Sequence, residues 1–148
     1  MSSDYRTVVV GTDGSSSSLL AVERAAKIAS AFNSRLVIAS AFYPPSTENA
    51  PLTKGESVVV IGEEQAAQNL AAAREHALQW YPHAETKMEE GSPVSALMAI
   101  VKAVRADLLV VGNRGINSLT GRLLGSVPAD VARQSDCDVM IVHTVGVN

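Results

Sequence analysis

Four short runs of consecutive β-branched or aliphatic residues recur along the chain, separated by longer stretches with helical spacing. The runs lie at residues 7–10, 36–39, 108–111 and 139–142. A strand that is apolar at every position, rather than at alternate ones, is buried on both faces, and such strands are typical of parallel sheets covered by helices. This pattern limits the chain to the α/β class of folds.

Helical spacing and end signals predict the elements between these runs. Serines 15–18 suit the start of the first helix, Ser92 and Pro93 suit the start of the third, and Pro82 stops the second. The start of the second helix stays open, because residues 58–61 fit a short extended piece equally well. We expect strands at residues 5–12, 35–42, 84–90, 107–112 and 137–144, and helices at residues 19–33, 57–81, 92–106 and 126–135.

Strands that alternate with helices form parallel units whose crossovers are right-handed. The sequence therefore predicts a doubly wound, open, parallel five-stranded sheet with helices on both faces. We expect a single domain over residues 1–148, because a chain of this length can bury roughly two thirds of its unfolded surface and needs no disulfides.

Composition excludes several classes of function. The 12 Lys and Arg residues are scattered, 15 Asp and Glu residues give a net charge of −3, and aromatic residues make up 4% of the chain. Nucleic-acid binding, which relies on basic patches and base stacking, is therefore not expected. The single Cys137 fits a reducing, cytoplasmic setting. We expect no membrane association, since no apolar stretch reaches the ~18 residues of a span.

In open parallel sheets, ligands bind beyond the carboxyl ends of the strands, where the winding reverses. Two loops, at residues 11–15 and 112–126, are expected there. The second is rich in glycine and ends at Ser126, which opens a helix, so its backbone N–H groups could cradle a phosphate while Arg114 and Arg122 add positive charge. A surface loop followed by a serine helix cap is the alternative interpretation.

The two loops offer few groups for catalysis. No phosphate-binding motif with Lys and no dinucleotide-binding glycine motif is present, so we expect no catalytic residue. Asp13 could accept hydrogen bonds from an adenine amine or a ribose hydroxyl, or cap the following helix, and the two readings are equally good. It is also the one plausible metal ligand in these loops, and we expect no metal site. His76, His83 and His143 are expected away from both loops.

Four positions of the second loop match the pattern G-x-x-G, nine residues, then G-[ST]. With Asp13 after the first strand and the apolar run that closes the chain, this pattern resembles the universal stress protein family, in its nucleotide-binding branch. The resemblance covers nearly the whole chain in the same order of elements. The matching positions are Gly112, Gly115, Gly125 and Ser126.

The resemblance implies strand order 3-2-1-4-5 and an adenine nucleotide, ATP or AMP or cyclic AMP, between the first and fourth strands. Asp13 and the backbone of Ala41 would hold adenine and ribose, and Gly11 and Thr12 would shape the turn. It implies a stress-response regulator or sensor that binds rather than catalyses, with Mg²⁺ an optional companion of ATP. Ribose and phosphates would be lined by Gly112, Arg114, Gly115, Gly125, Ser126 and Val127.

Three other functions stay open. One is a slow ATP hydrolase that uses the same pocket, and another is an interaction module that binds no ligand. A response-regulator receiver domain has similar length and alternation. It would require two or three acids after the first strand, a phosphoacceptor Asp after the third and a Lys after the fifth, whereas this chain has Asp13 after the first and Glu89 and Glu90 at the end of the third.

The last strand is expected at the edge of the sheet. An apolar edge without a Lys or Pro guard can pair with a second chain. The resemblance points to the same place and implies a homodimer formed by antiparallel contact of two last strands. The residues involved would be Met140, Ile141, Val142, His143 and Thr144.

Overall fold

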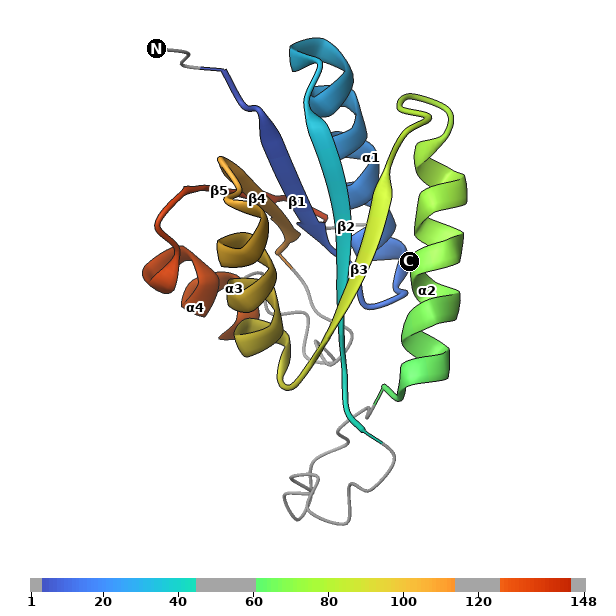
Figure 1. The fold of residues 1–148 in the computed structure, drawn as a ribbon, viewed down its shortest axis with the longest axis vertical. Coiled ribbons are helices and arrows are strands. Elements are labelled where there is room, and N and C mark those ends of the chain that lie inside the picture. The colour runs from blue at the N-terminus through green and yellow to red at the C-terminus, as the bar shows by residue number, and fades with distance from the viewer. Residues whose placement is uncertain (1–3, 45–60, 114–125, 145–148) are drawn as a thin grey trace.

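The computed structural model describes residues 4–44, 61–113 and 126–144. Five parallel strands form one sheet in the order β3-β2-β1-β4-β5, which confirms the predicted α/β class, topology and strand order. The helices cover both faces of the sheet, with α1 and α2 on one side and α3 and α4 on the other (Figure 1). The elements are β1 (Thr7–Gly11), α1 (Ser16–Phe32), β2 (Arg35–Phe42), α2 (Glu63–Ala77), β3 (Glu85–Glu90), α3 (Pro93–Val104), β4 (Leu108–Gly112), α4 (Ser126–Gln134) and β5 (Asp138–Val142).

Two apolar clusters lie on opposite faces of the sheet. Val8 and Val10 of β1 pack with the alanines of α1, whereas Val9 between them packs with Leu97 of α3. All three valines are 0% exposed. Successive side chains of a strand point to opposite faces, so only a strand that is apolar at every position can serve both clusters. This is the physical reason that the continuous aliphatic runs predict the fold.

The helix ends follow the capping residues. The Ser15 side chain caps α1 by accepting the N–H of Ser18, and Ser92 caps α3 in the same way. The predicted end of the second helix at residue 81 is wrong, since α2 runs from Glu63 to Ala77, and its start, which the sequence leaves open, lies at Glu63. Gly62 is its N-cap and forms a bridge with Tyr43, so the chain is still extended there. Residues 57–60 lie outside the described ranges.

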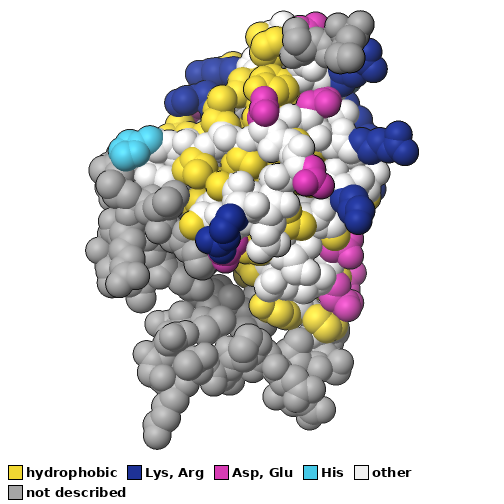
Figure 2. Space-filling model, turned by 90° about the vertical axis from the view of Figure 1, so that its left-hand side faces the viewer, with side chains coloured by type: hydrophobic (Ala, Val, Ile, Leu, Met, Phe, Trp, Pro, Cys, Tyr) yellow, Lys and Arg dark blue, Asp and Glu magenta, His cyan; other side chains and the backbone are white. Residues whose placement is uncertain are grey.

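The two edge strands differ in character. β3 carries charged and polar residues on both faces, and five of its six residues are exposed. β5 begins with Asp138 and is apolar from Val139 on. Its Met140 and Val139 pack against the two clusters, while Ile141 is 36% exposed. Basic and acidic side chains are interspersed on the face shown in Figure 2. Over the described ranges, no helix is long and apolar enough to cross a bilayer.

Candidate functional site

Strands β1 and β4 part at their carboxyl ends. Their pairing runs from Val8 with Leu108 to Val10 with Val110 and ends there. Beyond this point β1 follows β2, because the N–H of Thr12 donates to the carbonyl of Ala39 at 2.9 Å. β4 instead follows β5. We call residues 11–13 and 112–113, which flank this parting, the β1/β4 divergence, and it is the point at which sheets of this topology bind ligands.

A chain of hydrogen bonds fixes the turn after β1. The Ser18 hydroxyl donates to the carbonyl of Ser15 at 2.8 Å, so the Thr12 hydroxyl, 2.9 Å from Ser18 Oγ, donates to it. Thr12 Oγ1 in turn accepts the N–H of Gly14 at 3.2 Å. Both hydroxyl groups belong to buried residues. The first of the two candidate loops is therefore held by its own side chains.

Asp13 lies at the centre of this turn. Its Oδ1 accepts the N–H of Ser15 at 2.9 Å, which is the helix-start role considered for it. This bond also orients the carboxylate, whose two oxygens can accept more than one hydrogen bond. The helix-start role and a role toward a ligand are therefore compatible. No group of three or more His, Cys, Asp or Glu side chains suited to a metal ion occurs among the described residues.

Helix α2 contacts the same turn through Asn69. The Asn69 Nδ2 atom donates to the carbonyl of Asp13 at 3.4 Å, and its Oδ1 accepts from Gln65 at 2.9 Å. Gly14 has a φ of +86°, and a Cβ atom there would lie 2.6 Å from Asn69 Oδ1. Glycine suits this position, because residues with a side chain rarely adopt such a φ, and a Cβ atom would also require the Asn69 amide to move.

Across the divergence, Asn113 follows the last residue of β4. It is 4% exposed, and its Oδ1 accepts both the N–H of Thr144 at 2.8 Å and the hydroxyl of Thr144 at 2.7 Å. Asn113 Nδ2 lies 3.4 Å from Nδ1 of His143. The expectation that no histidine lies near the two loops is therefore wrong, because β5 ends beside β4 and brings His143 to the start of the second loop.

The structure brings together several of the predicted site residues. Gly11, Thr12 and Asp13 lie on the β1 side of the divergence, with Gly112 on the β4 side. Ala41 lies on β2 two residues beyond Ala39, the partner of Gly11. Val127, in the first turn of α4, packs against the cluster around Leu97. Ser126 opens α4, whereas Arg114, Gly115, Arg122 and Gly125 lie outside the described residues.

Sequence reasoning missed the two polar residues that close the end of the sheet. The sequence pattern places Asn113 in the second loop and Thr144 on the edge strand of the sheet. The sequence carries a usable signal, because Asn113 and Thr144 each lie two residues beyond an apolar run, at 108–111 and 139–142, and parallel neighbours end at the same side of the sheet. Polar side chains placed there are expected to meet.

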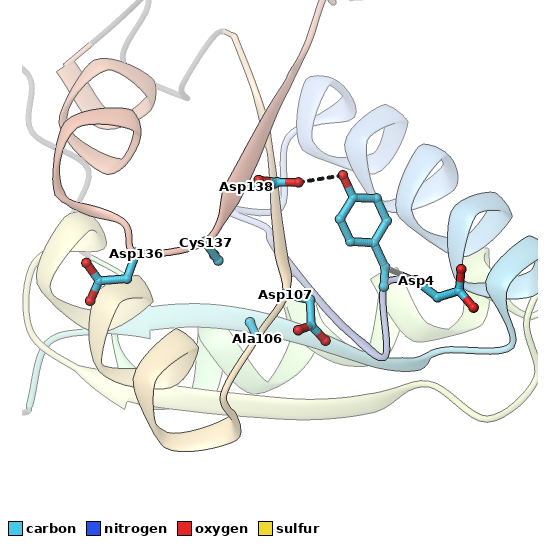
Figure 3. Close-up of a pocket in the computed structure, with 7 residues that line it drawn as sticks. Asp4, Ala106, Asp107, Asp136, Cys137 and Asp138 are labelled. Carbon is cyan, nitrogen blue, oxygen red and sulfur yellow. Dashed lines mark hydrogen bonds between the residues drawn. The ribbon is translucent and has the colours of Figure 1, made fainter. Parts of the chain in front are cut away.

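A shallow hollow of about 320 Å³ lies at the opposite end of the sheet, beside the amino ends of β1, β4 and β5 (Figure 3). Its carboxylates bind groups of the protein itself: Asp138 accepts the Tyr5 hydroxyl at 2.8 Å, and Asp107 accepts the N–H of Thr7 at 2.9 Å. Burial and the nearby aspartates raise the pKa of the Cys137 thiol. The lining residues are Asp4, Tyr5, Ala106, Asp107, Asp136, Cys137 and Asp138.

Comparison with known proteins identifies the family. The model of the universal stress protein family matches residues 4–143. The chain belongs to the universal stress protein family. Universal stress protein Rv1636 of Mycobacterium tuberculosis is 48% identical over 145 residues, a match that covers 96% of this chain and 99% of that protein. The resemblance carried by the glycine pattern is therefore confirmed.

Solved structures of the family agree with the fold. A universal stress protein in complex with cAMP is 45% identical, with a TM-score of 0.73 over 96% of this chain and 99% of that chain. The universal stress protein of Archaeoglobus fulgidus in complex with dAMP is 18% identical, with a TM-score of 0.65 over 93% of this chain and 98% of that chain, and shares the fold. Both of these relatives bind adenine nucleotides.

Proposed function

We propose that this universal stress protein binds an adenine nucleotide at the β1/β4 divergence and acts as a stress-response regulator or sensor rather than as a catalyst. The observation that carries the proposal is the complex of a 45% identical relative with cAMP, a likeness that extends over 96% of this chain. The parting of β1 and β4 supports the location, because ligands of doubly wound sheets bind where the winding reverses.

In this proposal, the β1 side of the divergence holds the nucleoside. The Asp13 carboxylate, oriented by the N–H of Ser15, accepts a hydrogen bond from a ribose hydroxyl or the adenine amine. The backbone of Ala41 contributes from β2. Adenine is held by aliphatic walls and polar contacts rather than by stacking, since aromatic residues make up 4% of the chain.

The phosphate side relies on backbone groups. The first N–H groups of a helix have no partner within it and favour an anion, so the start of α4 at Ser126 and Val127 suits a phosphate. Gly112 and the glycine-rich stretch after it, with Gly115 and Gly125, allow close backbone approach. Arg114 and Arg122 supply the positive charge that a chain of net charge −3 otherwise lacks.

The chemistry of the site favours small nucleotides as much as ATP. The loop contains no Lys of the kind that grips a γ-phosphate, and Asp13 alone among the residues assigned to the site could bind Mg²⁺. Affinity is therefore expected to depend little on the γ-phosphate, so cAMP and AMP compete with ATP. A binder without a positioned nucleophile or a cationic clamp has little to offer a transition state.

Two measurements test the proposal. Protein purified from cells is denatured and the released small molecules are identified by mass spectrometry; we expect an adenine nucleotide. Isothermal titration against cAMP, AMP and ATP then ranks the affinities, and phosphate release from ATP is followed in parallel. No released nucleotide together with no heat of binding would contradict the proposal and favour an interaction module. Phosphate release at several turnovers per second, lost in Asp13→Ala, would favour a hydrolase.

We also infer a homodimer formed through the edge strand β5, over Met140, Ile141, Val142, His143 and Thr144. The edge position of β5 and the exposure of Ile141 support it. Ile141→Lys puts a charge on that edge, whereas Glu89→Lys changes the other edge and serves as the control. We expect sedimentation to give the mass of two chains for the wild type and the control, and of one chain for Ile141→Lys.

A further inference from the structure

The end of β4 depends on β5 for its position. β1 and β4 stop pairing at Val10 and Val110, whereas β4 continues to pair with β5 through Val111 and Gly112. The N–H of Asn113 extends this ladder by donating to the carbonyl of Val142 at 2.9 Å. The direction in which β4 leaves β1 is therefore set by contacts with the edge strand.

The side chains of Asn113 and Thr144 add hydrogen bonds between the two segments just beyond the last pair of that ladder. Both residues are buried, at 4% and 0% exposure. The two hydrogen bonds from Thr144, at 2.8 and 2.7 Å, use both lone pairs of the Asn113 side-chain carbonyl. A buried pair that is satisfied in this way has one preferred geometry, because any shift leaves a polar atom unpaired in an apolar setting.

We infer that Asn113 and Thr144 are positioning residues for nucleotide binding: their hydrogen bonds fix the end of β4 and so place the Gly112 backbone opposite Asp13. This inference rests on the proposed function. Neither side chain is assigned a contact with the ligand, since the Asn113 carbonyl is already occupied by Thr144. The pair acts on affinity through the backbone that borders the site.

A pair that only stabilised the fold would behave differently. Its loss would lower the melting temperature but leave the affinity of the folded protein unchanged. Ser34 offers a matched control, because it is 3% exposed and its hydroxyl donates to the carbonyl of Tyr5 at the amino end of the sheet. Ser34→Ala thus removes one buried hydroxyl hydrogen bond far along the strands from the β1/β4 divergence.

The variants Thr144→Val, Thr144→Ser, Asn113→Ala and Ser34→Ala are compared by isothermal titration with cAMP, well below each melting temperature, and by thermal unfolding. We expect affinity to fall about threefold in Thr144→Val and about tenfold in Asn113→Ala, as one and two hydrogen bonds are lost. Thr144→Ser, which keeps the hydroxyl, is expected to bind like the wild type. Ser34→Ala is expected to lose stability and keep full affinity.

The outcomes separate this inference from the proposed function. If the wild type binds and Thr144→Val binds equally well, the inference is overturned and the proposed function stands. If Ser34→Ala weakens binding as much as Thr144→Val does, the effect is one of general stability and the inference is again overturned. If the wild type binds no adenine nucleotide, the proposed function fails first and the inference fails with it. Thr144→Val keeps the side-chain volume and decides the test even if Asn113→Ala does not fold.

Discussion

The two ends of the parallel sheet differ in what surrounds their carboxylates. At the amino end, four aspartates and Cys137 line a hollow, and the structure assigns Asp107 and Asp138 to groups of the protein itself. At the carboxyl end, Asp13 lies in a turn held by Thr12 and Ser18, beside strands that part. Figure 3 shows the carboxylates of the amino end gathered around the hollow.

In the proposed function, the hollow and the ligand site lie at opposite ends of the sheet. The cluster of carboxylates at the amino end would repel an anionic nucleotide, because repulsion between like charges a few ångströms apart weakens binding of the nucleotide. The carboxyl end has a glycine turn and a helix start, which favour an anion. Substitutions at the carboxyl end are therefore expected to change affinity, and those at the amino end to change stability alone.

The largest effect is expected from Asp13→Ala. Loss of a carboxylate that accepts hydrogen bonds from the ligand costs about 2 kcal/mol, which corresponds to about a 30-fold weaker binding of cAMP. Isothermal titration with cAMP measures this loss of affinity. Asp13→Asn is the matched control, because it keeps an oxygen acceptor for the N–H of Ser15 and retains part of the affinity. Wild-type affinity in Asp13→Ala would contradict the proposed contact of Asp13 with the ligand, and with it the contrast between the two ends of the sheet.

Gly14→Ala is expected to lower both stability and affinity. The φ of +86° strains an alanine at this position, and its Cβ atom would displace the Asn69 amide that contacts the turn, at a cost of about 1.5 kcal/mol. Denaturant unfolding and titration with cAMP measure the two losses. Gly62→Ala is the control, since a Cβ atom there meets nothing within 4 Å. If both variants behave like the wild type, the Asp13 turn is not rigid.

Asp107→Ala tests the amino end. Its Oδ2 accepts the N–H groups of Arg6 and Thr7 at 3.0 and 2.9 Å, and we expect a loss of about 1 kcal/mol in the free energy of unfolding. The affinity for cAMP is expected to stay unchanged. Asp107→Asn keeps one acceptor oxygen and should recover part of the stability. A marked change in affinity in Asp107→Ala would show that the two ends are coupled.

The smallest effect is expected from the ion pair at the start of β2 and β3. Arg35 donates to both oxygens of Glu85, at 2.7 and 2.8 Å, which lowers the pKa of Glu85 from 4.5. A lowered pKa in the folded state contributes stability above pH 4.5 that is lost as the pH falls through the lowered value. The pair is solvent-exposed, so Glu85→Gln is expected to cost about 0.5 kcal/mol.

Denaturant unfolding of the wild type and Glu85→Gln at several pH values measures this difference. The difference in the free energy of unfolding between the two proteins should be largest near neutral pH, shrink below pH 4.5 and decrease at high salt. A difference that grows as the pH falls would mean that the Arg35 pair does not govern the titration of Glu85.

The fold was predictable because its decisive signals are local. Val8, Val9 and Val10 serve both faces of the sheet, which only a helix-covered parallel strand requires. Ser92 marks the start of α3 for the same reason, since its cap is made within three residues. The first helix begins at Ser16 rather than at the predicted residue 19, because Ser15 is the serine of that run which caps it. The start of α2 was not predictable, because the bridge between Tyr43 and Gly62, its N-cap, is a contact between segments and leaves no local trace.

The same distinction between local signals and contacts between distant segments applies to the candidate site. The pattern of glycines and Asp13 predicts a site between two loops, and the structure brings the strands that precede these loops, β1 and β4, side by side. The contacts of Asn113 with Thr144, and of Asn69 with the Asp13 turn, join residues 31 and 56 positions apart. No periodicity encodes such pairs. The exact partners become evident only when the register of the sheet and the packing of α2 are known.

The unequal edges of the sheet have a consequence for assembly. β3 ends the sheet with exposed Glu and Lys side chains on both faces, which discourage further pairing, whereas β5 ends it with an apolar strand. When a second copy adds through β5, the combined sheet is bounded on both sides by β3. Such an interface is self-complementary and leaves no free edge of the same kind. If the proposed dimer forms through β5, the charged β3 edges limit the assembly to two copies rather than allowing it to continue into a filament.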